Sequence, residues 1–213
     1  DEKPNWLTPM VGKLADSVMV NINNAAAINA VTLMSSILLN TEKQAMTRNE
    51  LTACMTNYLR LLELAPYSKD VSVPNKSAEE LLEHALTLDK FEVITQGRVE
   101  VIRIQDTQKV LLNYYRNNVL HLCAVPSLIS SILISQKHIS RDQLIKQVNA
   151  LYPLFKQEWF MQPYCETYLN DSLEALSGIG LLTVENDAIS VNPSSKSLAQ
   201  LNLLARFIQC TLI

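Results

Sequence analysis

The polar and apolar residues of this chain alternate mostly with the period of an α-helix. The first apolar stripe follows Thr8-Pro9, where a capping hydroxyl precedes a proline at the first helical position. It consists of Val11, Leu14, Val18 and Ile22. Asn23 and Asn24 are expected to open a second helix over residues 25–39. Its predicted buried stripe consists of Ile28, Val31, Met34, Ser35 and Leu38.

Two further helices begin with the spacing of a capping box, in which a hydroxyl at the cap precedes a Glu by three residues. Thr47 and Glu50 predict a helix over residues 50–64 that stops before Pro66. Ser77 and Glu80 predict another helix that runs to about residue 90. Residues 66–76, which hold prolines and serines, are predicted to form a loop.

The pattern changes to a period of two over residues 91–95 and 98–104, on either side of Gln96-Gly97. Such alternation around a short turn is typical of a β-hairpin. Residues 181–191 predict a second hairpin with Asn186-Asp187 at its turn.

The order of these elements occurs twice along the chain. The segment that starts at Leu33 matches the one at Leu128, and the segment at Met46 matches the one at Ile139. We therefore predict a mainly α fold of tandem winged-helix-like repeats with two short β-hairpins. The predicted parts are an N-terminal helix over 1–22, a first unit over 23–110, a second unit over 111–193 and a C-terminal helix over 194–213.

The C-terminal helix is predicted over residues 197–212, with an apolar stripe of Leu198, Leu201, Leu204, Ala205 and Ile208. An apolar stripe of this kind has to be buried against another element. We expect a part of the protein that is absent from this chain to cover it.

Charge argues against a nucleic-acid partner, although winged helices often bind DNA. The formal net charge is −3. The helices before the two predicted wings are acidic and carry Glu79, Glu80, Glu83 and Asp89 in the first and Glu166, Asp171 and Glu174 in the second. Because binding to a duplex needs Lys and Arg at phosphate positions, these helices would repel it.

The four cysteines are Cys54, Cys123, Cys165 and Cys210, and their spacing matches neither a disulfide framework nor a zinc site. We expect free thiols in a reducing, cytosolic setting. We also expect no metal and no cofactor.

One short segment is dense in polar groups and precedes the apolar residues 122–134. It holds Tyr114, Tyr115, Arg116, Asn117, Asn118 and His121. A helix that starts near residue 114 would place four of these side chains on one side, namely those of Tyr114, Asn117, Asn118 and His121. One interpretation is a buried polar network that fixes helix packing. The other is a contact surface for a partner domain or an anionic ligand, with Arg116 as the charged anchor.

The run Leu-Asn-Tyr-Tyr-Arg-Asn-Asn-Val-Leu-His at 112–121 resembles a segment of bacterial membrane-associated glycerol-3-phosphate acyltransferases. Residues 5–9, 22–39, 66–68, 89–93, 138–142 and 148–153 also resemble that family. The resemblance covers nearly the whole chain. It implies a piece of the C-terminal half of such an enzyme, downstream of its acyltransferase motifs.

By this resemblance, the parent protein transfers a fatty acyl group from acyl-CoA or acyl carrier protein to the first hydroxyl of glycerol 3-phosphate. This step begins phospholipid synthesis at the cytoplasmic face of the bacterial inner membrane. The implied partners of the region are the upstream catalytic domain of the same protein and a membrane surface. We expect the region to be soluble, to have no catalytic residue and to brace the catalytic domain. The alternative is an independent module that binds another protein through residues 114–121 or through the C-terminal helix.

His84 and Asp89 match the His-x4-Asp spacing by which glycerolipid acyltransferases activate the acceptor hydroxyl. The family's companion Glu-Gly-x-Arg-Ser block is absent from the sequence. We therefore interpret this pair as part of a solvated helical face. Residues 119–134 fall short of the ~20 apolar residues that span a bilayer, so we expect a core helix that starts at Pro126.

Overall fold

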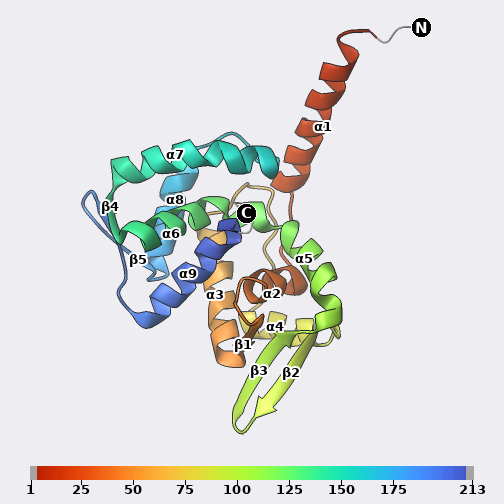
Figure 1. The fold of residues 1–213 in the computed structure, drawn as a ribbon, viewed down its shortest axis with the longest axis vertical. Coiled ribbons are helices and arrows are strands. Elements are labelled where there is room, and N and C mark those ends of the chain that lie inside the picture. Colours follow the sequence, from red (N-terminus) through yellow and green to blue (C-terminus); the bar gives the residue numbers. More distant parts are fainter. Residues whose placement is uncertain (1–3, 210–213) are drawn as a thin grey trace.

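A computed structural model describes residues 4–209 of the chain, which form two units of the same element order (Figure 1). The first unit consists of α2 (Ala30–Leu38), β1 (Ala45–Thr47), α3 (Arg48–Leu64), α4 (Ala78–Leu86), β2 (Phe91–Gln96) and β3 (Val99–Ile104). The second consists of α6 (Ala124–Gln136), β4 (His138–Ser140), α7 (Arg141–Glu158), α8 (Glu166–Gly178), β5 (Leu182–Glu185) and β6 (Ala188–Val191). The remaining elements are α1 (Leu7–Asn24), η1 (Asp106–Gln108), α5 (Lys109–Asn117), η2 (Leu120–Cys123) and α9 (Ser195–Gln209).

Each unit closes with a three-stranded antiparallel sheet, and the strand orders correspond. The first sheet has the order β1-β3-β2 and the second β4-β6-β5. In the first, Met46 pairs with Ile102, and in the second Ile139 pairs with Ile189. The mainly α fold and both predicted hairpins are confirmed. The third strand of each sheet was not predicted, because three residues are too few to show a period of two.

The turn of the first hairpin lies one residue later than the pattern indicates. Gln96 still pairs with Val99, so Gly97 and Arg98 form the two-residue turn. Gly97 has a φ of 64°, which glycine adopts without strain, and such values are what a tight hairpin turn requires. The second hairpin turns at Asn186-Asp187, as predicted.

Side-chain caps fix the starts of three helices, the first two as the capping-box spacing predicts. Thr47 caps α3, Ser77 caps α4 and Ser140 caps α7, each in a capping box with the residue three positions later. The second predicted helix begins later than expected, because Asn29 and Thr32 form a capping box at the start of α2. The preceding residues instead bond to the loop of the first unit, where the Ile28 amide donates to the carbonyl of Ser72 at 2.8 Å.

Helix α4 ends four residues before the predicted limit of about residue 90. Its C-cap is Thr87, whose hydroxyl donates to the carbonyl of His84 at 2.7 Å. Asp89 follows with a φ of 52°, which a helix cannot contain. Asp89 therefore lies outside the helix that carries His84.

The core runs through both units, and its central helices are α2 and α6. All nine residues of α2 are buried. Helix α6 packs along α9, and Leu201, Leu204 and Ile208 of α9 are buried. The expectation that α9 needs a cover from outside the chain is therefore wrong. Its predicted last residues, 210–212, lie outside the described residues.

Helix α1 differs from the rest, because none of its residues is buried. It stands out from the two units at one corner of the molecule, with only its C-terminal end against them (Figure 1). The stripe predicted from residues 11, 14, 18 and 22 is thus exposed in this structure.

Among residues 4–209, no single helix is long and apolar enough to cross a bilayer. Residues Asp106–Asn117 and Leu120–Gln136 reach the required length and hydropathy only together, and they are bent by 62° at the break between them.

Candidate functional site

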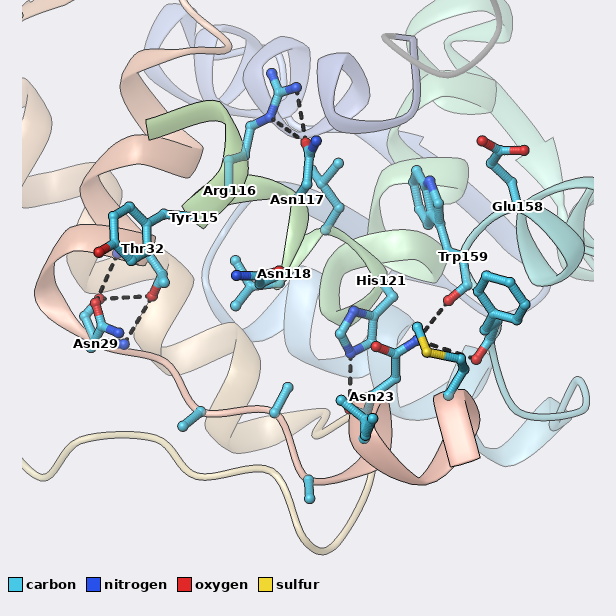
Figure 2. A pocket seen from close by; sticks show the side chains of 18 residues that line it. Asn23, Asn29, Thr32, Tyr115, Arg116, Asn117, Asn118, His121, Glu158 and Trp159 are labelled. Carbon is cyan, nitrogen blue, oxygen red and sulfur yellow. Dashed lines mark hydrogen bonds between the residues drawn. The ribbon is translucent and has the colours of Figure 1, made fainter. Parts of the chain in front are cut away.

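A pocket of about 810 Å³ lies where α1, α5 and α7 end (Figure 2). Its walls come from the last turn of α1, residues 25–29, the C-terminal end of α5, and the residues that follow α7. These segments are far apart in the sequence. The polar segment singled out above contributes Tyr115, Arg116, Asn117, Asn118 and His121 to the pocket lining.

The local path of this segment differs from the expected helix that starts near residue 114. Helix α5 begins at Lys109, directly after the η1 turn, and it ends at Asn117. Val119 then adopts φ −128° and ψ 0°, which breaks the helix before η2. His121 therefore lies on a separate turn, and the four side chains expected on one side of a single helix do not share one.

His121 is the buried member of the segment, with 3% of its surface exposed. Its Nε2 lies 2.9 Å from the carbonyl oxygen of Asn23 at the end of α1. Because a carbonyl only accepts, Nε2 carries the proton in this pair and Nδ1 is left as the acceptor. Burial lowers the pKa of His121 to about 4, against a partial rise from the bond to Asn23. The ring is therefore neutral near pH 7.

Asn23 connects the same point to α7. Its side-chain amide donates to the carbonyl of Trp159 at 2.7 Å and to that of Phe160 at 3.2 Å. These carbonyls follow the C-terminus of α7, where backbone acceptors have no partner within the helix. Asn23 therefore ties the ends of α1 and α7 together, and His121 ties both to η2.

The other members of the segment are more accessible to solvent than expected. Tyr114 is 64% exposed and lies outside the pocket lining, with its ring centroid 6.0 Å from that of Tyr115. Asn117 and Asn118 are exposed, whereas Tyr115 and Arg116 are half-buried. Arg116 donates to Oδ1 of Asn117 from Nε at 3.3 Å and from a terminal nitrogen at 3.2 Å. Burial thus holds for His121 and not for the segment as a whole.

Behind the pocket, an aromatic cluster joins the two units. The ring of Tyr67, from the loop of the first unit, stands edge-on to His121 with centroids 5.1 Å apart. Tyr67 also stands edge-on to Tyr168 of α8, at 6.0 Å. The hydroxyl of Tyr168 donates to the carbonyl of Leu122 at 2.9 Å. Such T-shaped pairs favour a fixed arrangement, so the wall formed by His121 is held from both units.

The sequence did not point to several residues that complete the pocket, namely Asn23, Asn29, Glu158, Trp159 and Phe160. Asn23 was interpreted as the opening of a helix, whereas it ends one. Asn29 is the N-cap of α2, and this role becomes visible only in the capping box that it forms with Thr32 in the structure. No sequence pattern marked Phe160, because its exposure of 38% shows only in the folded chain.

The groups in this pocket can bind a ligand and can hold the surrounding elements together. A neutral, buried imidazole bonded to a backbone carbonyl has no paired carboxylate to orient it as a general base. Among residues 4–209, no group of three His, Cys, Asp or Glu side chains could hold a metal ion.

Comparison with known proteins shows where this fold belongs. The model of the family "Glycerol-3-phosphate acyltransferase C-terminal region" matches residues 1–213, which is the entire chain. The chain belongs to this family. A glycerol-3-phosphate acyltransferase of Pseudoalteromonas translucida (strain TAC 125) is 44% identical over 211 residues, which are 99% of this chain and 26% of that protein. The chain therefore spans about a quarter of the length of this curated relative.

Within this acyltransferase C-terminal region, His84 and Asp89 do not form a catalytic pair of the family's kind. His84 is exposed on α4, whose neighbouring side chains Glu79 and Glu83 bond to Arg48. Oδ1 of Asp89 accepts instead from the side-chain amide of Gln105 at 3.4 Å. The interpretation as a solvated helical face therefore holds for His84 alone, and it is wrong for Asp89, which is exposed beyond the end of α4.

Proposed function

We propose that this chain is a non-catalytic region of a longer glycerol-3-phosphate acyltransferase and that it braces the catalytic domain of that protein. The observation that carries the proposal is the match of all 213 residues to the family's C-terminal region, combined with 26% coverage of the curated relative. In the parent, the reaction would transfer an acyl group from acyl-CoA or acyl carrier protein to glycerol 3-phosphate.

The junction between the two units supports a bracing role. Three segments meet at Asn23, whose carbonyl and side-chain amide bond to His121 and to the residues after α7. The aromatic cluster around Tyr67 lies directly behind. Half-buried and satisfied polar contacts of this kind favour one arrangement of the parts. A region held in this way is suited to position a neighbouring domain.

The direct test compares the full-length parent protein with a version that ends before Asp1, in an assay of glycerol 3-phosphate acylation. We expect the shortened protein to lose most of its activity, and the purified chain alone to show no turnover. Full activity of the shortened protein would exclude the bracing role. Turnover by the isolated chain that His84→Ala abolishes would show that the chain is itself catalytic.

A second candidate function is an independent protein-interaction module, and the pocket favours it. Asn117 and Asn118 are exposed at its rim beside half-buried Arg116, and a guanidinium is a frequent anchor for a partner's carboxylate. The C-terminal helix does not serve this alternative, because its stripe is buried against α6. Arg116→Ala separates the two functions: a loss of partner binding with unchanged acylation by the parent would favour the module.

A further inference from the structure

Helix α1 carries a continuous apolar stripe that the described part of the chain leaves uncovered. The stripe is formed by Leu7, Met10, Val11, Leu14, Val18 and Ile22. Leu14 is 63% exposed and Ile22 58%, and no residue of α1 is buried. At 100° per residue these six side chains lie within roughly 120° of the helix circumference, which is the width of a core-facing stripe.

The attachment of α1 leaves this stripe available. Asn23, which bonds to the residues after α7, lies on the other side of the helix, together with Lys13 and Asp16. Only the last turn is attached, and the rest of α1 extends away from the two units (Figure 1). Ile22 and Met19 also line the pocket, so the lower end of the stripe continues into the pocket wall. Stripe and pocket form one continuous surface.

An exposed stripe of this size needs a partner. Most of the stability of a protein helix comes from packing its apolar face, and helices shorter than ~12–15 residues are marginal alone even in the best sequences. Helix α1 has 18 residues and includes Gly12, which weakens its intrinsic preference for the helix. No side chain caps its start, so contacts along the stripe are expected to hold the helix in its regular form.

The charges of α1 argue against a lipid surface as that partner. Helices that lie on membranes usually carry Lys and Arg along the polar face, which attract anionic headgroups. The charged residues of α1 are Lys13 and Asp16, whose charges cancel. A second copy of α1 is also a poor match, because a coiled coil is indicated by apolar heptads over at least about three to four repeats, and the 18 residues of α1 span about two and a half.

We propose that the apolar stripe of α1 is the docking surface for an apolar helix face in the part of the parent polypeptide that lies outside these 213 residues. This inference rests on the proposed function, in which the chain is one region of a longer acyltransferase. The curated relative is long enough to supply such a helix, since this chain covers 26% of it. Within one polypeptide, an effective concentration in the millimolar range makes even a single stripe sufficient for stable docking.

The test places a photo-crosslinker in the full-length parent protein, as Leu14→p-benzoylphenylalanine. Asp16→p-benzoylphenylalanine is the matched control, because Asp16 is also exposed and lies on the other side of the same helix. We expect crosslinks within one polypeptide, mapped by mass spectrometry to residues outside 1–213, at a yield about tenfold above the control for a contact sustained by the tether. Val11→p-benzoylphenylalanine repeats the test should the first variant fail to fold.

Covalent dimers would overturn the inference in favour of a second copy, and adducts with lipid alone would overturn it in favour of a membrane surface. Equal yields from Leu14 and Asp16 would also overturn it. The outcome is independent of activity, so it separates the two proposals. Loss of activity on truncation without the expected crosslink would mean that the region braces the enzyme through another surface.

Discussion

Tyr67 and Gln162 join the two units through two hydrogen bonds, both donated by Gln162. The backbone amide of Gln162 donates to the hydroxyl oxygen of Tyr67 at 2.8 Å, and the Gln162 side-chain amide donates to the carbonyl of Tyr67 at 2.6 Å. Tyr67 is 2% exposed, so neither bond is easily replaced by water. Tyr67 thus links the loop of the first unit to the segment between α7 and α8.

Removal of the Tyr67 hydroxyl tests this link. Tyr67→Phe keeps the ring contacts with His121 and leaves the Gln162 amide without its acceptor, which costs about 1–3 kcal/mol when the group is buried. We expect the free energy of unfolding in urea to fall by that amount. Tyr114→Phe is the control, because Tyr114 is 64% exposed and its change should stay within about 0.5 kcal/mol. Equal effects in the two variants would contradict the assigned role of Tyr67.

The titration of His121 predicts a dependence of stability on pH. Its pKa falls from 6.5 to about 4 through burial, so between these values the unfolded chain binds more protons than the folded one. The contribution of the neutral ring is fully present above pH 6.5 and is lost as the pH falls toward 4. In free energy it amounts to roughly 3 kcal/mol, from 1.36 kcal/mol per pKa unit.

The measurement is the free energy of unfolding between pH 7.5 and pH 4.5, compared with that of His121→Gln. Glutamine can still donate an amide hydrogen to the Asn23 carbonyl, but it does not titrate. We expect the difference between the two proteins to shrink as the pH falls. Parallel profiles for the native chain and His121→Gln would rule out the prediction.

Local chemistry explains which parts of this fold the sequence predicted. The capping boxes at Thr47, Ser77 and Ser140 lie within four residues, and both hairpins pair residues close in sequence. Strands β1 and β4 escaped prediction because each gains its hydrogen bonds from a distant strand, β3 and β6. The start of α2 was placed too early because the bond between Ile28 and Ser72, a tertiary contact, holds the preceding residues extended.

The pocket was predictable only in part, for the same reason. Residues 114–121 stood out by their density of polar groups. Their partner Asn23 bonds in turn to Trp159, 136 residues further along the chain, and these contacts form only in the folded chain. Likewise, the apolar stripe of α9 gave no indication that α6 would cover it. Apolar periodicity predicts that a face must be buried, but it does not identify the element that buries it.

An ion cluster around Arg48 gives a further prediction. Its guanidinium bonds to Glu79 at 3.1 Å, to Glu100 at 2.5 Å and also to Glu83, so it joins α3, α4 and β3. Arg48→Lys keeps the charge but loses the planar fork that reaches several carboxylates. Because the three carboxylates are largely exposed, we expect a loss of no more than about 1 kcal/mol in unfolding free energy.

Salt identifies the origin of this effect. At 1 M NaCl, where the screening length is about 3 Å, the difference between Arg48→Lys and the native chain should decrease. Arg98→Lys, in the exposed turn of the first hairpin, is the control and should be neutral at both salt concentrations. A difference that does not change with salt would assign the role of Arg48 to the fixed hydrogen-bond geometry of its guanidinium rather than to its charge.

The end of α8 supplies the last prediction, through two glycines two residues apart. Gly180 has a φ of 78°, and its amide donates to the carbonyl of Ser177 at 2.9 Å while the next amide, of Leu181, donates to that of Leu176 at 3.0 Å. This is a Schellman motif, in which the left-handed residue lets the chain turn back and satisfy the last helical carbonyls. Gly180→Ala should therefore lower the unfolding free energy by about 1–2 kcal/mol, because a Cβ disfavours this conformation.

Gly178→Ala is the matched control: Gly178 is the last residue of α8, and nothing lies within 4 Å of an added Cβ there. Alanine is also the better helix former, so this variant should be neutral or slightly more stable in the same urea titration. Equal losses from both substitutions would mean that the end of α8 is sensitive to any added side chain rather than to the backbone conformation of Gly180.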